Sequence, residues 1–269
     1  MSPFPDFTAL DRLRAARPLI HCVSNIVAAN DCANVLLAAG ASPMMAQCAL
    51  EAEAVTAASR ATVLNTGTPD EGRFGLCRLL ARCAGKQGHP VVLDPVGVGT
   101  SPWRLSEVRA LLEETPPAIL RVNLGEALAL LGDSGREQGV DGGGGDPASR
   151  RASALALAER CRCAVLLSGP EDHAAWDGRV YRIEGGSALT GYVTGSGCML
   201  SVLCGAFAAV ADTPGEAAVL ASAFWKTCAR RAEQSAGGRG PGSFRAALMD
   251  AAYTLTARDL AEEARITTV

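Results

Sequence analysis

The chain has 269 residues, a formal net charge of −3, and a composition that is 48% hydrophobic but only 4% aromatic. This length and aliphatic content predict one globular domain over 1–269 and exclude a disordered or fibrous chain. The sequence shows no basic stripe, membrane-length apolar stretch or secretory signal, which predicts a cytoplasmic protein that binds neither nucleic acid nor membrane.

Four short apolar runs, each followed by polar or glycine residues, are the predicted strands of the first two thirds of the chain. They span 61–64, 90–93, 118–120 and 164–167. Because they are apolar throughout, they favour strands buried on both faces, which is typical of a parallel sheet. Helical patterns alternate with them over 71–86, 106–114, 124–131 and 148–161.

The last third of the chain is predicted to be mostly helical. Asp177-Gly178 predicts a hairpin turn between strands at 174–176 and 180–183, and helices are expected from Cys198 onward. The alternating strands and helices predict an α/β fold with a mostly parallel central sheet and helices on both faces. The glycine-rich stretch 133–147 is predicted to be a flexible surface loop, because no strand precedes it as in a phosphate loop.

Polar side chains stand where the predicted strands end. They are Asp94, Arg121, Asn123 and Ser168, with Glu126 one helical turn past Asn123. In an open α/β sheet, ligands bind beyond the carboxyl ends of the strands. The set therefore indicates a binding site, although each member alone also suits a cap or a turn, as Asp94 does before Pro95.

A glycine-rich turn, Thr194-Gly195-Ser196-Gly197-Cys198, precedes an apolar helix. Glycines there allow successive N–H groups to converge, and the helix start adds partial positive charge, which suits a phosphate or a transferring phosphoryl group. The same pattern also suits a turn that packs a helix tightly against a sheet, and the residues alone leave both interpretations open. The turn lacks the Gly-Lys-Ser/Thr of a Walker A loop and the third glycine of a dinucleotide fingerprint.

Cys198 is the one of ten cysteines whose context suggests chemistry. The others are scattered through apolar segments, which is typical of small buried residues in a reducing compartment rather than of disulfides or zinc ligands. Cys198 is predicted to be the first or second residue of its helix, where the helix dipole favours the thiolate. It would then accept a proton or hold an alcohol. A buried filler residue is the competing interpretation.

Five segments together resemble the hydroxyethylthiazole kinases, thiamine-salvage enzymes of the ribokinase-like superfamily, over nearly the whole chain. The segments are 18–25, 34–45, 93–99, 121–126 and 193–198. The resemblance implies a three-layer ribokinase-like fold. It also implies ATP-dependent phosphorylation of the hydroxyethyl group of 4-methyl-5-(2-hydroxyethyl)thiazole, with Mg²⁺ as the metal.

The resemblance further implies roles for single residues. Asn25, Met45 and Gly195 would contact the thiazole, Arg121, Ser168, Thr194 and Gly197 would bind ATP, and Asp94 and Glu126 would hold or orient Mg²⁺. Cys198 would lie beside the substrate hydroxyl, where most ribokinase-like enzymes place an aspartate as general base. The family's homotrimer, with active sites at subunit interfaces, would put Asn25 and Met45 across an interface from Cys198.

Some residues depart from the family pattern, which concerns substrate and nucleotide detail rather than reaction type. They are Cys22, Ser24, Val122, Leu124, Gly125 and Ser168. Two rival functions stay open: a related kinase acting on a hydroxymethylpyrimidine or pyridoxal-like alcohol, and a non-catalytic binding protein on the same fold. The segment 25–45 favours the thiazole, and the complete set of strand-end groups favours an enzyme. His21, within the first segment, is predicted to be a buried and hydrogen-bonded histidine rather than a substrate contact.

Overall fold

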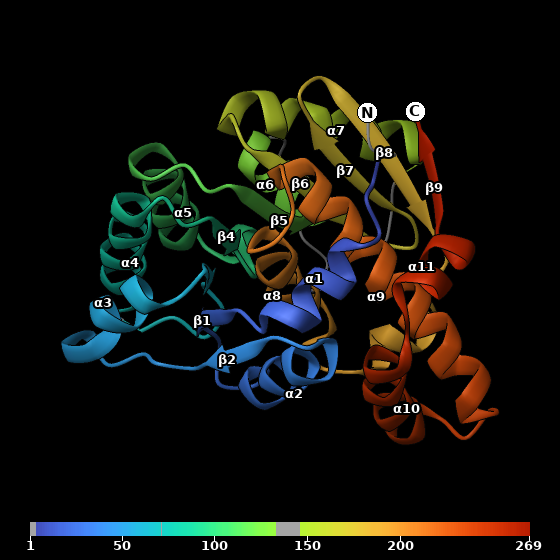
Figure 1. Ribbon diagram of the computed structural model, residues 1–269. Coiled ribbons are helices and arrows are strands. Elements are labelled where there is room, and N and C mark those ends of the chain that lie inside the picture. Colours follow the sequence, from blue (N-terminus) through green and yellow to red (C-terminus); the bar gives the residue numbers. More distant parts are fainter. Residues whose placement is uncertain (1–3, 71, 133–145) are drawn as a thin grey trace.

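The computed structural model describes residues 4–70, 72–132 and 146–269 (Figure 1). Its centre is a nine-stranded sheet in the order β2-β1-β3-β4-β5-β6-β7-β8-β9. The strands are β1 (Leu19–Val23), β2 (Ser42–Met44), β3 (Ala61–Asn65), β4 (Val91–Asp94), β5 (Ile119–Asn123), β6 (Ala164–Ser168), β7 (Asp172–Trp176), β8 (Arg179–Glu184) and β9 (Arg265–Thr268). Neighbours from β2 to β6 are parallel, whereas β7, β8 and β9 each pair antiparallel with the strand before them.

Helices cover both faces of this sheet (Figure 1). They are α1 (Ala9–Ala16), α2 (Ala29–Ala39), α3 (Ala49–Ala58), α4 (Arg73–Gln87), α5 (Pro102–Glu114), α6 (Leu124–Leu131), α7 (Pro147–Cys161), α8 (Ser196–Ala208), α9 (Pro214–Ala236), α10 (Pro241–Thr254) and α11 (Ala257–Glu263), with 3-10 turns η1 (Val98–Thr100) and η2 (Ala188–Tyr192). One core packs α1, α2, α8, α9 and α10 on the sheet, and the other packs α3 to α7. The predicted α/β fold with helices on both faces is confirmed.

Side chains alternate between the two cores along each buried strand. In β6, Leu166 joins the core under α8 and α9, whereas Val165 and Leu167 join the core under α7. This period of two explains why the strand sequences are apolar throughout, since each residue meets one helical layer or the other. The predicted strands at 61–64, 90–93, 118–120 and 164–167 are β3, β4, β5 and β6, and the hairpin turn at Asp177-Gly178 joins β7 and β8.

Helix caps account for the places where the predicted helix bounds were right or wrong. Helix α6 has the predicted bounds, because Asn123 and Glu126 form a capping box at its start and Gly132 ends it in the left-handed conformation. Helix α5 begins at Pro102 rather than at 106, since the Ser101 side chain accepts the Arg104 N–H and proline suits the first helical position.

Two further expectations need correction. Pro147 is the first residue of α7 and Asp146 is its N-cap, so the predicted loop 133–147 ends earlier, and 133–145 lies outside the described residues. The chain after Cys198 also ends in a strand, β9, which pairs with β8. None of the helices in the described part of the chain combines the length and the apolar character needed to cross a membrane.

Candidate active site

A cavity of about 1120 Å³ opens at the carboxyl edge of the parallel strands. It extends from Asn25, just after β1, to Ser168 at the end of β6. The strands β3, β4 and β5 lie between β1 and β6, so the two points are four strand spacings apart, roughly 19 Å of sheet at the usual spacing. The predicted meeting of the strand-end groups at one edge is therefore confirmed, and the space suits a nucleotide beside a small second ligand.

The turn before α8 forms one wall of this cavity. Gly195 is the N-cap with φ +78°, and a Cβ there would lie 2.6 Å from the Ala28 Cβ, so both its conformation and its packing require glycine. Gly197 is held against the Arg121 guanidinium, whose nitrogens would lie 2.6 Å from a Cβ at this position. The turn thus packs its helix closely and also presents its helix N-terminus to the cavity, together with Thr194.

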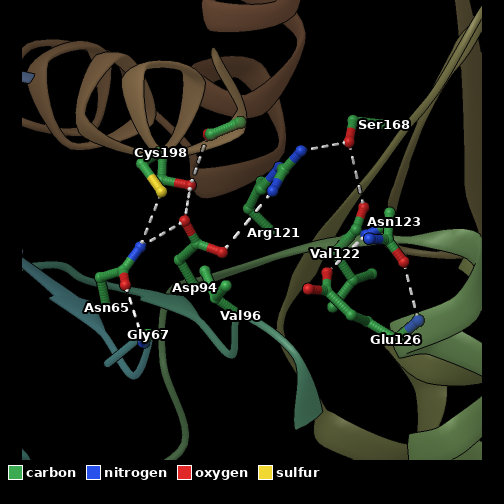
Figure 2. A network of polar contacts seen from close by, with 12 residues as sticks. Asn65, Gly67, Asp94, Val96, Arg121, Val122, Asn123, Glu126, Ser168 and Cys198 are labelled. Atoms are coloured by element: carbon green, nitrogen blue, oxygen red, sulfur yellow. Dashed lines mark hydrogen bonds and ion pairs between the residues drawn. The ribbon is translucent and has the colours of Figure 1, made fainter. Parts of the chain in front are cut away.

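Arg121 projects from β5 to the centre of the site (Figure 2). One guanidinium nitrogen donates to the Ser168 hydroxyl at 2.5 Å, and another lies 3.6 Å from the Asp94 carboxylate. Its nitrogens are held in place by these partners and by the α8 turn, although the Nε lacks a hydrogen-bond partner among the described residues. A fixed, buried guanidinium that reaches the cavity is suited to bind the oxygens of a phosphate.

Asp94 lies behind Arg121, fully buried at the end of β4. Its Oδ2 accepts a hydrogen bond from Asn65 Nδ2 at 2.8 Å (Figure 2). It also accepts one from the Ser201 hydroxyl at 2.7 Å. Its Oδ1 has no hydrogen-bond partner among the described residues and lies 3.6 Å from Arg121. Asn65 and Ser201 thus orient the carboxylate so that Oδ1 faces Arg121, and Asp94 itself is not among the described residues that line the cavity.

Cys198 lines the cavity as the third residue of α8 rather than the first or second as predicted, because the helix begins at Ser196 after the N-cap Gly195. Asn25 Nδ2 and Asn65 Nδ2 each donate to its Sγ at 3.2 Å. Burial, followed by the negative charge of Asp94, raises the pKa of the thiol to about 12, and Arg121 and the two amides offset only part of this. The expectation of a thiolate favoured by the helix dipole is therefore wrong, because loss of hydration outweighs the local field. At neutral pH Cys198 is a neutral thiol.

Asn25 and Met45 were expected to lie across a subunit interface from Cys198. For Asn25 this is wrong, since its amide contacts the Cys198 Sγ of the same chain. The reason is local: the segment after β1 turns over the start of α8, where Asn25 also accepts the Ala28 N–H at 3.0 Å. Met45 follows β2 and packs against the core under α8, and among the described residues it is not part of the cavity lining.

Glu126 lines the cavity and closes the start of α6. Its Oε2 accepts the Asn123 N–H at 2.9 Å and its Oε1 accepts the Gly97 N–H at 3.0 Å. Burial raises the pKa of this carboxyl from its ordinary value of 4.5 to about 7, with Arg121 opposing and Asp94 adding to the shift. The side chain therefore links the ends of β4 and β5, and it changes charge near neutral pH.

The pKa of Glu126 predicts a pH dependence of stability. Between pH 4.5 and about 7 the folded protein keeps a proton that the unfolded chain has released, so stability falls as the pH rises through this window. Glu126→Gln cannot titrate, and its unfolding free energy relative to wild type should increase by about 3 kcal/mol from pH 4 to pH 8. Urea unfolding at a series of pH values measures this difference, and a difference that stays constant with pH would contradict the assignment.

Several residues in or next to the cavity were missed by reasoning from the sequence. Asn65 ends β3 in the run Asn-Thr-Gly, so its position at a strand end was a signal that could have found it. Arg150, Asp172 and Lys226 lie on α7, β7 and α9, and only the packing of these elements brings them to the cavity. Lys226 Nζ donates to the carbonyls of Gly169 and Pro170 at 2.7 and 2.8 Å and pairs with Asp172 at 3.2 Å.

His21 has the structural role that was predicted. It is fully buried in β1, with Nδ1 2.8 Å from the Thr56 hydroxyl and Nε2 2.7 Å from the Ala46 carbonyl. Because a carbonyl can only accept, Nε2 carries the proton and Nδ1 accepts from Thr56. Burial lowers the pKa of the ring, so it is neutral at physiological pH and joins β1 to α3 and the segment after β2.

A divalent metal ion would find few ready ligands here. The described residues contain no group of three or more His, Cys, Asp or Glu side chains arranged to hold one. Asp94 Oδ1 is a buried carboxylate oxygen without a hydrogen-bond partner, whereas both oxygens of Glu126 already accept backbone N–H groups. This set fits Mg²⁺, which usually binds one or two carboxylates together with water and substrate phosphates.

Comparison with known proteins shows where this architecture occurs. A family model described as "Hydroxyethylthiazole kinase family" matches residues 10–258. The hydroxyethylthiazole kinase of Listeria monocytogenes is 38% identical over 261 residues, 97% of each chain. The solved structure of the hydroxyethylthiazole kinase protein of Pyrococcus horikoshii OT3 superposes with a TM-score of 0.87 at 34% identity and covers 98% of both chains.

A more distant likeness concerns the fold alone. An ADP complex of Bacillus subtilis pyridoxal kinase matches with a TM-score of 0.61 at 16% identity, and the match covers 79% of this chain and 91% of that one. The central sheet and its two helical layers are therefore shared with kinases of the ribokinase-like fold.

Proposed function

The chain belongs to the hydroxyethylthiazole kinase family, and on this premise we propose that it phosphorylates 4-methyl-5-(2-hydroxyethyl)thiazole with ATP in thiamine salvage. The substrate hydroxyl oxygen forms a bond to the γ-phosphorus, the bond from that phosphorus to the β-phosphate oxygen breaks, and ADP leaves. The observation that carries the proposal is the convergence of Arg121, the α8 turn and Cys198 on one cavity.

The cavity has room for the two substrates at opposite ends. The thiazole fits beside Asn25, Val27 and Gly195, near the ends of β1 and β3, where apolar and amide groups line the wall. The ATP phosphates fit over β4 to β6, where the α8 helix start and Arg121 offer N–H donors. The phosphate-binding residues of this proposal are Arg121, Ser168, Thr194 and Gly197. Because phosphoryl transfer depends mainly on positioning and on stabilising spread negative charge, these groups supply its main requirements.

Asp94 and Glu126 are the residues that would hold or orient Mg²⁺ with the phosphates. When bound, Mg²⁺ neutralises part of the charge on the phosphate oxygens. Asp94 would contribute Oδ1, which has no hydrogen-bond partner among the described residues and is oriented by the bonds of Asn65 and Ser201 to Oδ2. Glu126 would contribute through water, because its oxygens are engaged by the backbone.

Cys198 positions the substrate hydroxyl rather than removing its proton. Its Sγ accepts from two amides, which leaves the S–H free to point away from both, and with a pKa of about 12 it is not a base at neutral pH. A strong base is not needed when the transition state is loose, because the hydroxyl becomes acidic only as its oxygen bonds to phosphorus. The proton can then pass to a phosphate oxygen.

Replacing Cys198 by alanine should lower kcat about tenfold, the loss of one modest hydrogen bond. Cys198→Asp should keep or raise kcat, since Asn25 and Asn65 can donate to a carboxylate that also accepts the hydroxyl proton. Steady-state rates from pH 6 to pH 9 measure both effects. The ratio of wild-type to alanine rates should stay constant over this range, because the thiol does not titrate there. Unchanged turnover in the alanine variant would contradict a catalytic role.

The assembly and location of the protein are part of the same proposal. We propose a homotrimer with active sites at subunit interfaces, supported by exposed apolar side chains on the segments around Asn25 and Met45, namely Ile26, Val27, Met44 and Leu50. Met45 would reach the thiazole of a neighbouring subunit in such an assembly, and the molar mass in solution tests it. We also propose a cytoplasmic location, with which the ten free cysteines agree.

The decisive experiment on function is a coupled assay for ADP release with ATP and Mg²⁺. It compares 4-methyl-5-(2-hydroxyethyl)thiazole with a hydroxymethylpyrimidine and with pyridoxal. We expect turnover of the thiazole to exceed that of the other alcohols. Clear turnover of another alcohol without turnover of the thiazole would reject the substrate, and no turnover of any alcohol would favour a binding protein.

A further inference from the structure

Arg150 is a buried cation of the cavity that the function described so far does not use. It lies in the first turn of α7, with 5% of its surface exposed, and its side chain lines the cavity beside Gly169. The guanidinium lies so close to the Gly169 Cα that a Cβ there would overlap it. Its one hydrogen bond within the described residues, from Nη1 to the Ser168 carbonyl, is long at 3.4 Å.

The other cations of the cavity have carboxylate partners, and Arg150 does not. Arg121 lies 3.6 Å from Asp94, and Lys226 lies 3.2 Å from Asp172. Within the described ranges Arg150 forms no ion pair, and the charges of Asp172 and Glu171 only partly oppose the effect of burial, which lowers its pKa. A buried guanidinium remains charged and needs acceptors for its five N–H groups. Its remaining N–H groups are open to the cavity, where an anion can accept from them.

The position of Arg150 indicates which anion this is. Ser168 lies between the two arginines: its hydroxyl accepts from Arg121, and its carbonyl accepts from Arg150. Arg121 projects from β5 beside the α8 turn and Cys198. Arg150 lies at the end of the neighbouring strand β6, next to Gly169, whose carbonyl accepts from Lys226. An extended phosphate chain that begins at Cys198 and passes Arg121 therefore reaches Arg150 next.

We propose that Arg150 is a second phosphate-binding arginine, beside Arg121, which binds the phosphate oxygens on the nucleoside side of the transferred group. This inference takes one point from the proposed function, namely that a nucleoside triphosphate binds in the cavity. It adds a positively charged contact that ADP retains after the transfer, so Arg150 holds the nucleotide in place without taking part in the bond exchange.

The test compares the purified Arg150→Gln variant with wild type by calorimetric binding of ADP and of adenosine. We expect ADP to bind roughly 10- to 100-fold more weakly, the loss of a charge-assisted hydrogen bond, and adenosine to bind within about twofold of wild type. The KM for ATP should rise by a similar factor, whereas the KM for the thiazole alcohol stays within about twofold. Arg151→Gln is the matched control, because Arg151 is exposed on the same helix.

Thermal unfolding separates this role from a structural one. Removing a buried charge without a partner should leave the melting temperature of the ligand-free protein unchanged or raised, while the stabilisation by ADP falls. If Arg150 serves only to offset the negative charges of Asp172 and Glu171, Arg150→Gln should instead lower the melting temperature and leave ADP binding intact, which would overturn the proposal. Arg150→Met retains the unbranched stem and gives the same comparison if the glutamine variant does not fold.

The outcomes also distinguish this inference from the proposed function. Thiazole turnover with unchanged ADP affinity in Arg150→Gln rejects the role of Arg150 alone. Absence of thiazole turnover in wild type, together with an ADP affinity that depends on Arg150, rejects the proposed substrate alone.

Discussion

Arg121→Met should reduce kcat/KM for ATP by roughly a thousandfold, the order of effect seen when an arginine on a transferring phosphoryl group is lost. The guanidinium is fixed by Ser168, Asp94 and the α8 turn, so it needs no rearrangement to meet developing negative charge. Steady-state kinetics under saturating thiazole, normalised to the folded fraction, measure the loss.

The interpretation of this variant requires a control for folding. Removing Arg121 leaves the buried Asp94 without its cation, which can cost about 3–5 kcal/mol of stability. Arg121→Lys keeps the charge but loses the planar fork, so it should fold better than the methionine variant and still fall well below wild-type activity. A folded Arg121→Met protein that stays within tenfold of wild type would remove Arg121 from the phosphate site.

Elements with strong local signals could be predicted from the sequence. Helix α6 is the plainest case, since the capping residues Asn123 and Glu126 and the terminating Gly132 lie within the helix sequence or next to it. The strands β3 to β6 were recognisable because each is an apolar run that ends in a polar or glycine residue.

Strands whose pairing depends on distant residues were not predicted. Strand β2 has only three residues, and it forms because 42–44 meets 19–21 of β1 in parallel register. Strand β9 is mostly exposed and polar, Arg-Ile-Thr-Thr, and is stabilised by its pairing with β8. Neither segment has a pattern of its own that separates a strand from a loop.

The chemistry of the site was only partly accessible for the same reason. The place of Cys198 at a helix start is local, but its pKa depends on burial and on Asp94, which is 104 positions away in the sequence and adjacent in space. Likewise Arg150 and Lys226 show no motif, and they reach the cavity only through the packing of α7 and α9 on the sheet. Strand-end residues could be found because their position follows from the topology.

Asp94→Asn should lower kcat by roughly a hundredfold or more and raise the Mg²⁺ concentration needed for half-maximal activity. The substitution removes the negative charge beside Arg121, on a carboxylate whose Oδ1 has no hydrogen-bond partner among the described residues. The side-chain oxygen of the new asparagine can still accept from Asn65 and Ser201. Its amide nitrogen then faces the Arg121 guanidinium, so two N–H donors point at each other. Activity titrated with Mg²⁺ at saturating ATP measures both effects.

Ser201→Ala is the matched comparison for Asp94→Asn, because it removes one hydrogen bond to Oδ2 and leaves the charge in place. If the charge of Asp94 carries the effect, Ser201→Ala should cost about tenfold or less in kcat, with little change in the Mg²⁺ requirement. If instead the orientation of the carboxylate carries it, the two variants should lose similar activity. A normal Mg²⁺ titration in Asp94→Asn would show that the metal is held elsewhere, and the polar network of Asn65, Asp94 and Ser201 would then serve to position Arg121 alone.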